Sequence, residues 1–202
     1  YGILLVADEV MTGFGRTGEW FAWQHWPDAA PDMMLLAKGL TAAHLPLGAV
    51  ALNQRCAAFF DDHPLPTGLT YAGHPLCCAA GVAALDVYER DGLVQRSAEL
   101  GRWLLERLSA IAARHAVVGD VRGLGLFAAL ELVADRATRR PLAPWPQTPA
   151  ALKKLAAEAK RRGVVLGTRG NLVIISPPLN ILHEDLDWGL GVLDELLGEM
   201  SG

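Results

Sequence analysis

The chain has few cysteines. Their number and spacing limit the metal sites and disulfides that it can form and indicate the redox state of its cellular compartment. Its 202 residues include three cysteines, Cys56, Cys77 and Cys78, and no histidine–cysteine spacing typical of a metal site. Three thiols cannot all pair, and Cys77 and Cys78 are neighbours inside a helical pattern. We therefore expect buried thiols, a reducing and hence cytoplasmic compartment, and no metal centre.

The sequence also lacks an excess of one charge and any long apolar run. Its net charge is −4 with both signs interspersed, which excludes the basic footprint of a protein that binds nucleic acid or a membrane surface. Its longest apolar runs are far shorter than the roughly 18 residues that a membrane helix needs. The composition, 51% hydrophobic and 20% charged, is typical of a globular protein, and we expect no nucleic-acid or membrane partner.

The start of the sequence has neither an initiator methionine nor a signal-peptide pattern. Residues 1–7, YGILLVA, instead form a continuous apolar run, which is typical of a parallel strand buried on both faces. Such a strand needs a neighbour on each side. We therefore expect the chain to be the C-terminal portion of a longer protein.

The first half of the chain predicts strands followed by helices. Apolar runs indicate buried strands at 1–8, within 32–39 and at 47–52. Pro75 at a helix-opening position and the Asp91-Gly92 stop predict a helix over 75–90. A second, amphipathic helix is predicted over about 93–114.

The second half has a different pattern. Glycines divide the apolar stretch 117–133 into a predicted pair of strands. After a proline-rich loop, the remaining predicted elements are a helix at 149–162, strands at 163–167 and 171–176, and a helix at 183–199. We therefore expect two domains, the remainder of a large α/β domain with a mixed or parallel sheet at 1–95 and a small α+β domain at 96–202.

A carboxylate and a lysine each follow one of the predicted strands. Asp8 ends the first apolar run, and Lys38, between the small residues Ala37 and Gly39, ends the second. Ligands of open α/β sheets bind outside the carboxyl ends of the strands. The two residues could form an ion pair, or Lys38 could simply reach solvent. They could also be the pair that a pyridoxal phosphate (PLP) enzyme needs, a Schiff-base lysine and an aspartate on the pyridinium nitrogen.

Three segments in order resemble signatures of the class III, omega-type, PLP-dependent aminotransferases. They are LLVADEVMTGFGRTGEWFA (4–22), PDMMLLAKGLTAAHLPLGAV (31–50) and TYAGHPLCCAAGVAALDV (70–87). VGDVRGLGLFAALELV (118–133) and GNLVIISPPLNI (170–181) resemble the small domain of the same family. The resemblance covers nearly the whole chain. It implies a fold-type I PLP-dependent transferase, of which this chain is the C-terminal portion.

The resemblance also implies a function and a set of site residues. The enzyme would move an amino group from an amine or an omega-amino acid to an oxo acid such as pyruvate or 2-oxoglutarate. Lys38 would carry the Schiff base and shuttle the proton, Asp8 would hold the pyridine nitrogen, and Val10 would pack on the ring. Thr70 would reach the cofactor phosphate across a homodimer interface with shared active sites. Its alternative is a turn or cap residue before the helix at Pro75.

Two arginines are candidates for contact with a substrate carboxylate. Arg16, in GFGRTG, could bind it or could pin its own loop by hydrogen bonds. Many relatives carry an arginine shortly before the SPPL segment, where this chain has Gly167, with Arg169 two positions on. Strand periodicity puts positions 167 and 169 on one face, so Arg169 could substitute for it or could be a plain surface arginine.

Other functions of the same fold remain alternatives. A PLP aminomutase or decarboxylase would keep the same lysine and aspartate, although GFGRTG and AKGL favour the aminotransferase branch. A non-catalytic PLP-fold fragment would need neither Lys38 nor Asp8. In this family the glycine-containing phosphate loop and the aromatic residue that stacks on the cofactor lie upstream of residue 1. We therefore expect this chain alone to bind PLP poorly.

Overall fold

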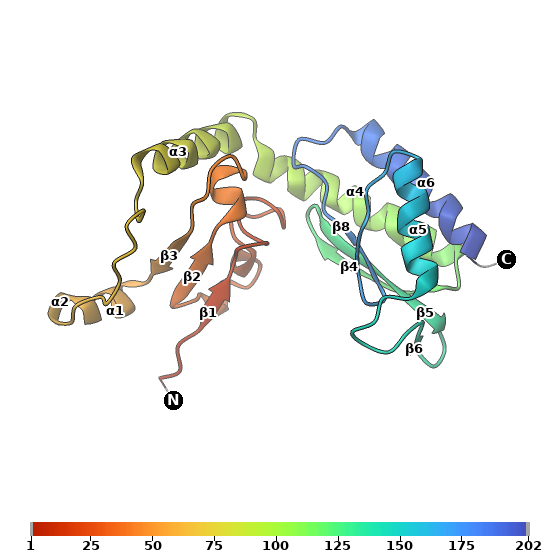
Figure 1. The fold of residues 1–202 in the computed structure, drawn as a ribbon, viewed down its shortest axis with the longest axis horizontal. Helices are drawn as coiled ribbons and strands as arrows, with labels where there is room; N and C mark the ends of the chain where they lie inside the picture. Colours follow the sequence, from red (N-terminus) through yellow and green to blue (C-terminus); the bar gives the residue numbers. More distant parts are fainter. Residues whose placement is uncertain (1, 201–202) are drawn as a thin grey trace. The chain divides into compact units, whose positions relative to one another are not determined.

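The computed structural model describes residues 2–200, so Tyr1, the first residue of the first predicted strand, lies outside them. The chain divides into two compact units, Tyr1–Gln95 and Arg96–Gly202 (Figure 1). The structure is mixed α/β, as the sequence predicts, with one sheet in each unit.

The sheet of the first unit has the order β1-β2-β3, formed by β1 (Val6–Asp8), β2 (Met33–Leu36) and β3 (Ala49–Leu52). β1 pairs with β2 in parallel, and β3 pairs with β2 in the antiparallel sense. The sheet is therefore mixed, and the parallel pair is the one that ends at the two candidate residues.

The first strand is shorter and more exposed than its apolar sequence predicts. It begins at Val6, and the side chains before it are open to solvent, with Ile3 82% exposed. Within residues 2–200, β1 pairs with β2 alone, so one of its edges has no neighbouring strand. The prediction of a buried strand from residue 1 is wrong for this chain because burial requires a strand or helix on both sides.

The long helix of this unit, α3 (Pro75–Arg90), has the predicted bounds. Pro75 occupies its first turn, His74 caps it by accepting a hydrogen bond from the backbone N–H of Leu76, and Gly92 lies just beyond its end with φ of 59°. The same unit also contains short helices, which are η1 (Ala22–His25), η2 (Pro27–Ala29), η3 (Lys38–Thr41), α1 (Gln54–Ala57) and α2 (Phe59–Asp62).

Burial along α3 corrects the expectation for the cysteines. Gly81, Ala84 and Tyr88 form the buried stripe of the helix, and Cys77 lies on the same stripe, four residues before Gly81. Cys78 lies off the stripe and is exposed, while Cys56 is buried in α1. The prediction that all three thiols are buried therefore holds for Cys56, is wrong for Cys78, and is met only in part by Cys77, which is half-buried.

The second unit is a helix-covered antiparallel sheet of order β4-β5-β8-β7, with β6 paired to β5. Its elements are α4 (Leu93–Arg114), β4 (Val118–Leu124), β5 (Phe127–Asp135), β6 (Arg140–Pro141), α5 (Ala150–Arg161), β7 (Gly167–Arg169), β8 (Leu172–Ile175) and α6 (His183–Met200). Alternate residues of β5 are buried, so one face of the sheet packs in the core.

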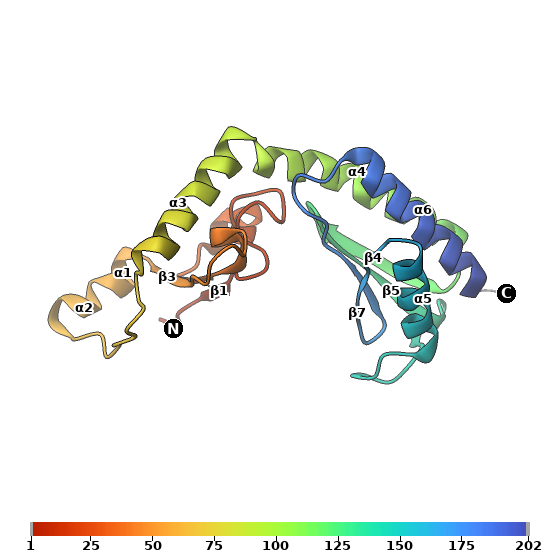
Figure 2. The same cartoon turned by 45° about the horizontal axis from the view of Figure 1, so that its top comes forward.

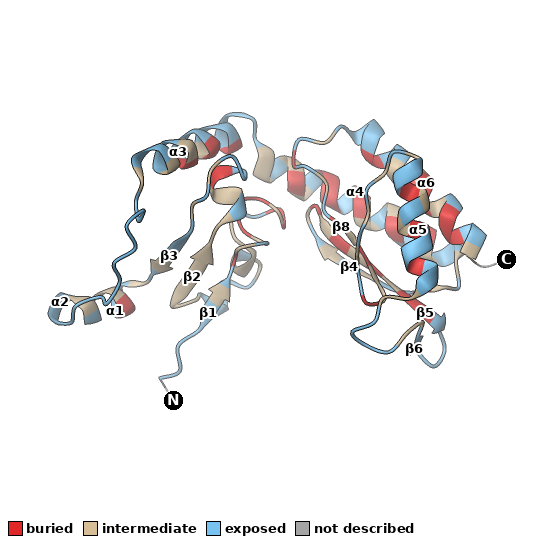
Figure 3. Ribbon diagram, viewed as in Figure 1, coloured by how far each residue is buried: buried red, intermediate tan, exposed pale blue. Residues whose placement is uncertain are grey.

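The helices of this unit bury one stripe each (Figure 3). α6 runs beside α4 (Figure 2), and Arg107 of α4 pairs with Asp187 of α6 at 3.0 Å. The core includes fully buried leucines from α4, β5 and α6: Leu104, Leu108, Leu130, Leu132, Leu193 and Leu197.

The strand predicted at 163–167 begins later, at Gly167. The reason is the end of α5, where the N–H of Gly163 bonds to the carbonyl of Lys160 and the N–H of Val164 bonds to that of Ala159. This pair of bonds, with Gly163 at φ of 89°, is a Schellman cap that turns the chain before the strand can form.

Candidate active site

Lys38 lies in a tight left-handed turn at the carboxyl end of β2. Its φ is 41°, a region that costs a non-glycine residue about 1–2 kcal/mol. Main-chain bonds close the turn: the N–H of Ala42 donates to the carbonyl of Gly39, and the N–H of Ala43 donates to that of Lys38, both at 3.1 Å. The lysine is therefore held at the sheet edge in a conformation that its surroundings must maintain.

The Lys38 side chain is exposed, as the surface-lysine alternative expects. Its Nζ contacts the Sδ atom of Met11. With Thr41 and residues 43–47, it lines a hollow of about 390 Å³. The amine therefore opens onto a space that could hold a small molecule.

Asp8 ends the strand beside β2. It lies opposite Leu35 in the parallel register, so Asp8 and Lys38 share one edge of the sheet. Its Oδ1 accepts a hydrogen bond from the N–H of Val10 at 3.1 Å, and its side chain is exposed. Among the ion pairs of the described residues there is none between Asp8 and Lys38, so the simple ion-pair alternative does not describe this chain.

Glu9 is the buried counterpart of Asp8. Successive residues of an extended chain point to opposite sides, and the Glu9 side chain is 2% exposed. Its carboxylate accepts hydrogen bonds from the Thr12 hydroxyl at 2.5 Å and from the N–H groups of Ala22 at 3.0 Å and Trp23 at 2.9 Å. This carboxylate folds the loop 12–23 back onto the sheet edge.

The folded loop supports the Lys38 turn through Phe14. Phe14 is 4% exposed, and its N–H donates to the carbonyl of Trp20 at 2.6 Å. A Cβ on Gly39 would lie 2.8 Å from the Cβ of Phe14, so a side chain at position 39 has no room. The small size of Gly39 therefore serves the packing of Phe14.

Sequence reasoning missed two of these residues, Glu9 and Tyr88. The Tyr88 hydroxyl, from α3, donates to the carbonyl of Gly39 at 3.0 Å. The sequence did contain a signal for Glu9. Successive residues of an extended chain point to opposite sides, so an outward-facing Asp8 implies an inward-facing residue at position 9. Nothing in the local sequence links residue 88 to residue 39.

Arg16 lies in the supported loop and beside Tyr88. Burial lowers the pKa of its guanidinium below the usual value, and the nearby Tyr88 acts in the opposite direction. Arg16 is thus partly buried beside Tyr88, and loop-pinning and carboxylate binding both stay predictions for it.

Val10 and Thr70 differ in their relation to this edge. Val10 is half-buried and follows the Asp8-Glu9 pair directly. Thr70 lies in an exposed turn, within a run of exposed residues that extends from 61 to 73. His74, not Thr70, caps α3, and Thr70 lies in a turn before that helix, in agreement with the turn half of its alternative. The structure thus brings Asp8, Val10 and Lys38 together and leaves Thr70 on an open segment.

Arg169 belongs to the second unit, where it ends β7 on an exposed face. Its guanidinium carbon lies 5.5 Å from the ring centroid of Trp145, which is a cation–π distance. Asn171 fixes the loop that carries Trp145, donating to the carbonyl of Ala143 at 2.8 Å and accepting from its N–H at 3.0 Å. Arg169 is therefore exposed but held against an aromatic ring.

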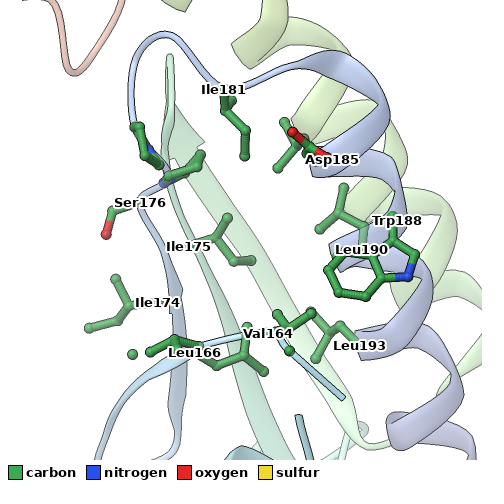
Figure 4. Close-up of a pocket in the computed structure, with 17 residues that line it drawn as sticks. Val164, Leu166, Ile174, Ile175, Ser176, Ile181, Asp185, Trp188, Leu190 and Leu193 are labelled. Carbon is green, nitrogen blue, oxygen red and sulfur yellow. The ribbon is translucent and has the colours of Figure 1, made fainter. Parts of the chain in front are cut away.

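A larger pocket, of about 480 Å³, lies within the second unit between α6 and the segments 163–167 and 174–178 (Figure 4). Its walls are mainly aliphatic, with Trp188 at one side and Asp185 as the charged residue among those that line it. Of the predicted site positions it contains only Gly167. It has no group able to carry amine chemistry.

Within 2–200, no three histidine, cysteine or acidic side chains gather as a metal would require. No helix in that range has the length and apolarity to cross a membrane.

Comparison with known proteins supplies a family. The profile described as "Aminotransferase class-III" matches residues 1–197. A diaminobutyrate–2-oxoglutarate transaminase from Halomonas elongata is 42% identical over an alignment of 198 residues that covers 93% of this chain and 40% of that protein. An adenosylmethionine-8-amino-7-oxononanoate aminotransferase from Geobacter sulfurreducens is 39% identical, over 100% of this chain and 45% of that protein.

Solved structures give the same result. A taurine:2-oxoglutarate aminotransferase from Bifidobacterium kashiwanohense, in complex with PLP and glutamate, matches with a TM-score of 0.94 and 41% identity over 98% of this chain and 44% of that one. A PLP-bound amine transaminase from an uncultivated Pseudomonas species matches with a TM-score of 0.91 and 43% identity, over 98% and 45%. The chain thus spans less than half the length of each of these relatives.

We predict that Glu9→Ala destabilises the loop beneath Lys38. The change leaves a hydroxyl and two partly buried N–H groups without their acceptor, and the free energy of unfolding should fall by about 3 kcal/mol. Urea unfolding followed by tryptophan fluorescence measures it, because Trp20 and Trp23 lie in the same loop. Glu19→Ala, at an exposed position of that loop, is the control and should change stability by less than about 0.5 kcal/mol. Equal effects of the two variants would contradict the role of Glu9.

Proposed function

This chain belongs to the class III aminotransferases, and on that premise we propose that the full-length protein is a PLP-dependent aminotransferase. It moves an amino group from an amine or an amino acid, including omega-amino acids, to an oxo acid such as pyruvate or 2-oxoglutarate. The observation that carries the proposal is Lys38 and Asp8 at the shared carboxyl edge of two paired parallel strands.

The substrate is proposed only as a class. The relatives include enzymes named for diaminobutyrate, for ornithine and for taurine. These donors share a primary amine and differ in their acidic group and chain length. Similarity to all of them supports amino transfer more strongly than any one donor.

The residues at the sheet edge fit PLP. An exposed primary amine lines a hollow, and a carboxylate on the neighbouring strand keeps Oδ2 clear of hydrogen bonds within the described residues. When bound, PLP supplies an electron-withdrawing ring that takes up the electron pair left when a proton leaves the substrate carbon. Lys38 would hold the cofactor covalently through Nζ, Asp8 would keep its ring nitrogen protonated, and Val10 would pack on the ring.

Lys38 then has a second task. When Nζ of Lys38 is not holding the cofactor, its amine would accept the proton from the substrate carbon and later give it back, as general acid–base catalysis requires. The main-chain bonds of the turn hold the Lys38 backbone at the sheet edge, from which Nζ would act.

We also propose a homodimer in which Thr70 of one subunit binds the cofactor phosphate of the other. The exposure of Thr70 and its neighbours supports a role outside its own subunit, and a hydroxyl with adjacent N–H groups suits a phosphate. In this proposal residues 1–95 belong to the large PLP-binding domain, residues 96–202 form the small domain, and the enzyme is cytoplasmic. Arg16 is assigned to pinning its loop.

We predict that Lys38→Ala removes the covalent cofactor. Wild-type full-length protein should show a visible PLP–lysine band that borohydride reduces, and the variant should lack it and lose at least about a hundredfold in transamination. Lys160→Ala, an exposed position of α5, is the control and should keep both. A Lys38→Ala protein with the reducible band and full turnover would refute the proposed function.

We predict that Asp8→Asn binds PLP but transaminates about a hundredfold or more slowly. Asparagine can still accept the hydrogen bond from Val10 but cannot balance a protonated ring nitrogen. Absorbance titration measures cofactor binding, and initial rates measure transfer. Unchanged turnover with bound cofactor would contradict the role of Asp8.

For Arg169, we predict a loss confined to substrates that bear a carboxylate. If its guanidinium leaves Trp145 to bind the acid group, Arg169→Ala should raise KM for amino acids about tenfold and leave simple amines unchanged. Arg139→Ala, an exposed arginine of the same unit, is the control. If Arg169→Ala has the wild-type KM for amino acids as well as for simple amines, Arg169 does not bind the substrate carboxylate.

A further inference from the structure

We propose that Tyr88 is a positioning residue for Lys38, which it controls through the carbonyl group of Gly39. The inference rests on the function proposed for Lys38. Tyr88 does not contribute to the chemistry itself, because its hydroxyl bonds to the main chain beside the lysine and not to the amine.

The contact is part-buried and joins two separate elements. Tyr88 belongs to the buried stripe of α3, is 7% exposed, and donates its hydroxyl to the carbonyl of Gly39 at 3.0 Å. The same carbonyl accepts the N–H of Ala42 at 3.1 Å. A carbonyl oxygen has two lone pairs, so both are used. The peptide that follows Lys38 is therefore fixed from its own turn and from α3.

This fixing matters because the lysine is in an unfavourable backbone conformation. Lys38 has φ of 41°, and such a conformation persists only where the surrounding structure determines it. Phe14 blocks one side, since Gly39 has no room for a Cβ against it. Tyr88 bonds to the Gly39 carbonyl, and the rings of Tyr88 and Phe14 lie 6.2 Å apart between centroids. Gly39 thus contacts two side chains from distant parts of the sequence.

The hydroxyl is also kept as a donor. Burial raises the pKa of Tyr88 above its usual value, and the charge of Arg16 offsets part of that rise. Tyr88 therefore stays protonated at neutral pH and donates to Gly39 throughout turnover. The ring contacts with Phe14 and with Trp20, at 6.1 Å, do not involve the hydroxyl, so Phe at position 88 would retain them.

The test is Tyr88→Phe in the full-length protein, with Ser97→Ala as the matched control. Ser97 is fully buried and its Oγ accepts the N–H of Leu126, so this control also deletes a buried hydroxyl, but in the second unit. Three measurements are made: the steady-state kinetics (kcat and KM) of the PLP-loaded enzyme, the amount of borohydride-reducible Lys38 adduct, and hydrogen exchange of the amides of residues 40–43 in the apo-protein.

We expect Tyr88→Phe to lower kcat about tenfold with KM within about twofold, because the proton-carrying amine is displaced while the substrate contacts stay. The Lys38 adduct should still form completely. Amide exchange in residues 40–43 should become about fivefold faster, as the loss of one hydrogen bond predicts. Ser97→Ala should leave all three measurements at their wild-type values.

Two results would overturn the inference. One is a Tyr88→Phe enzyme with wild-type kcat and unchanged exchange in residues 40–43. The other is equal changes in kcat, KM and exchange for Tyr88→Phe and Ser97→Ala, which would indicate general destabilisation. A failure of the proposed function would be distinguished from a failure of this inference by a different result. In that case the borohydride-reducible band would survive in Lys38→Ala. The exchange measurement needs no cofactor and decides the role of Tyr88 even in that case.

Discussion

The arrangement of the candidate site depends on one constraint, the left-handed turn that holds Lys38 at the carboxyl end of β2. A lysine in that conformation is less stable than in an ordinary turn by about 1–2 kcal/mol, a difference comparable to one or two net hydrogen bonds. The surrounding residues supply compensating interactions. Phe14 fills the space beside Gly39, Tyr88 bonds to its carbonyl, and the loop that carries Phe14 is folded by the buried carboxylate of Glu9. Removing any of these loosens the same turn.

Two adjacent acidic residues divide their roles by direction. Asp8 and Glu9 end one strand and point to opposite sides, so Asp8 is exposed at the edge and Glu9 is buried beneath the loop. Asp8 is therefore open to a ligand, while Glu9 is saturated by a hydroxyl and two backbone donors. A single dipeptide thus supplies the group proposed to act on the cofactor and the group that builds its support. Arg16 lies in the loop that Glu9 supports, near Tyr88.

Features set by neighbouring residues could be predicted from the sequence. Pro75 and Asp91-Gly92 define α3, amphipathic spacing defines α4, and apolar runs ending at Asp8 and Lys38 predict their common edge. Features set by distant contacts could not. The exposure of Ile3 depends on which strands flank β1, and the bond from Tyr88 to Gly39 spans 49 residues with no periodic signal. The late start of β7 follows from a cap whose hydrogen bonds compete with the strand.

The central claim is that Lys38, and no other lysine of this chain, carries the cofactor. The direct measurement is borohydride reduction of the PLP-loaded full-length protein, followed by proteolysis and mass spectrometry of the lysine-containing peptides. The chain has lysines at 38, 153, 154 and 160. The account predicts the reduced pyridoxyl group on the peptide that contains Lys38. An unmodified Lys38 with the group on Lys153, Lys154 or Lys160 would contradict it.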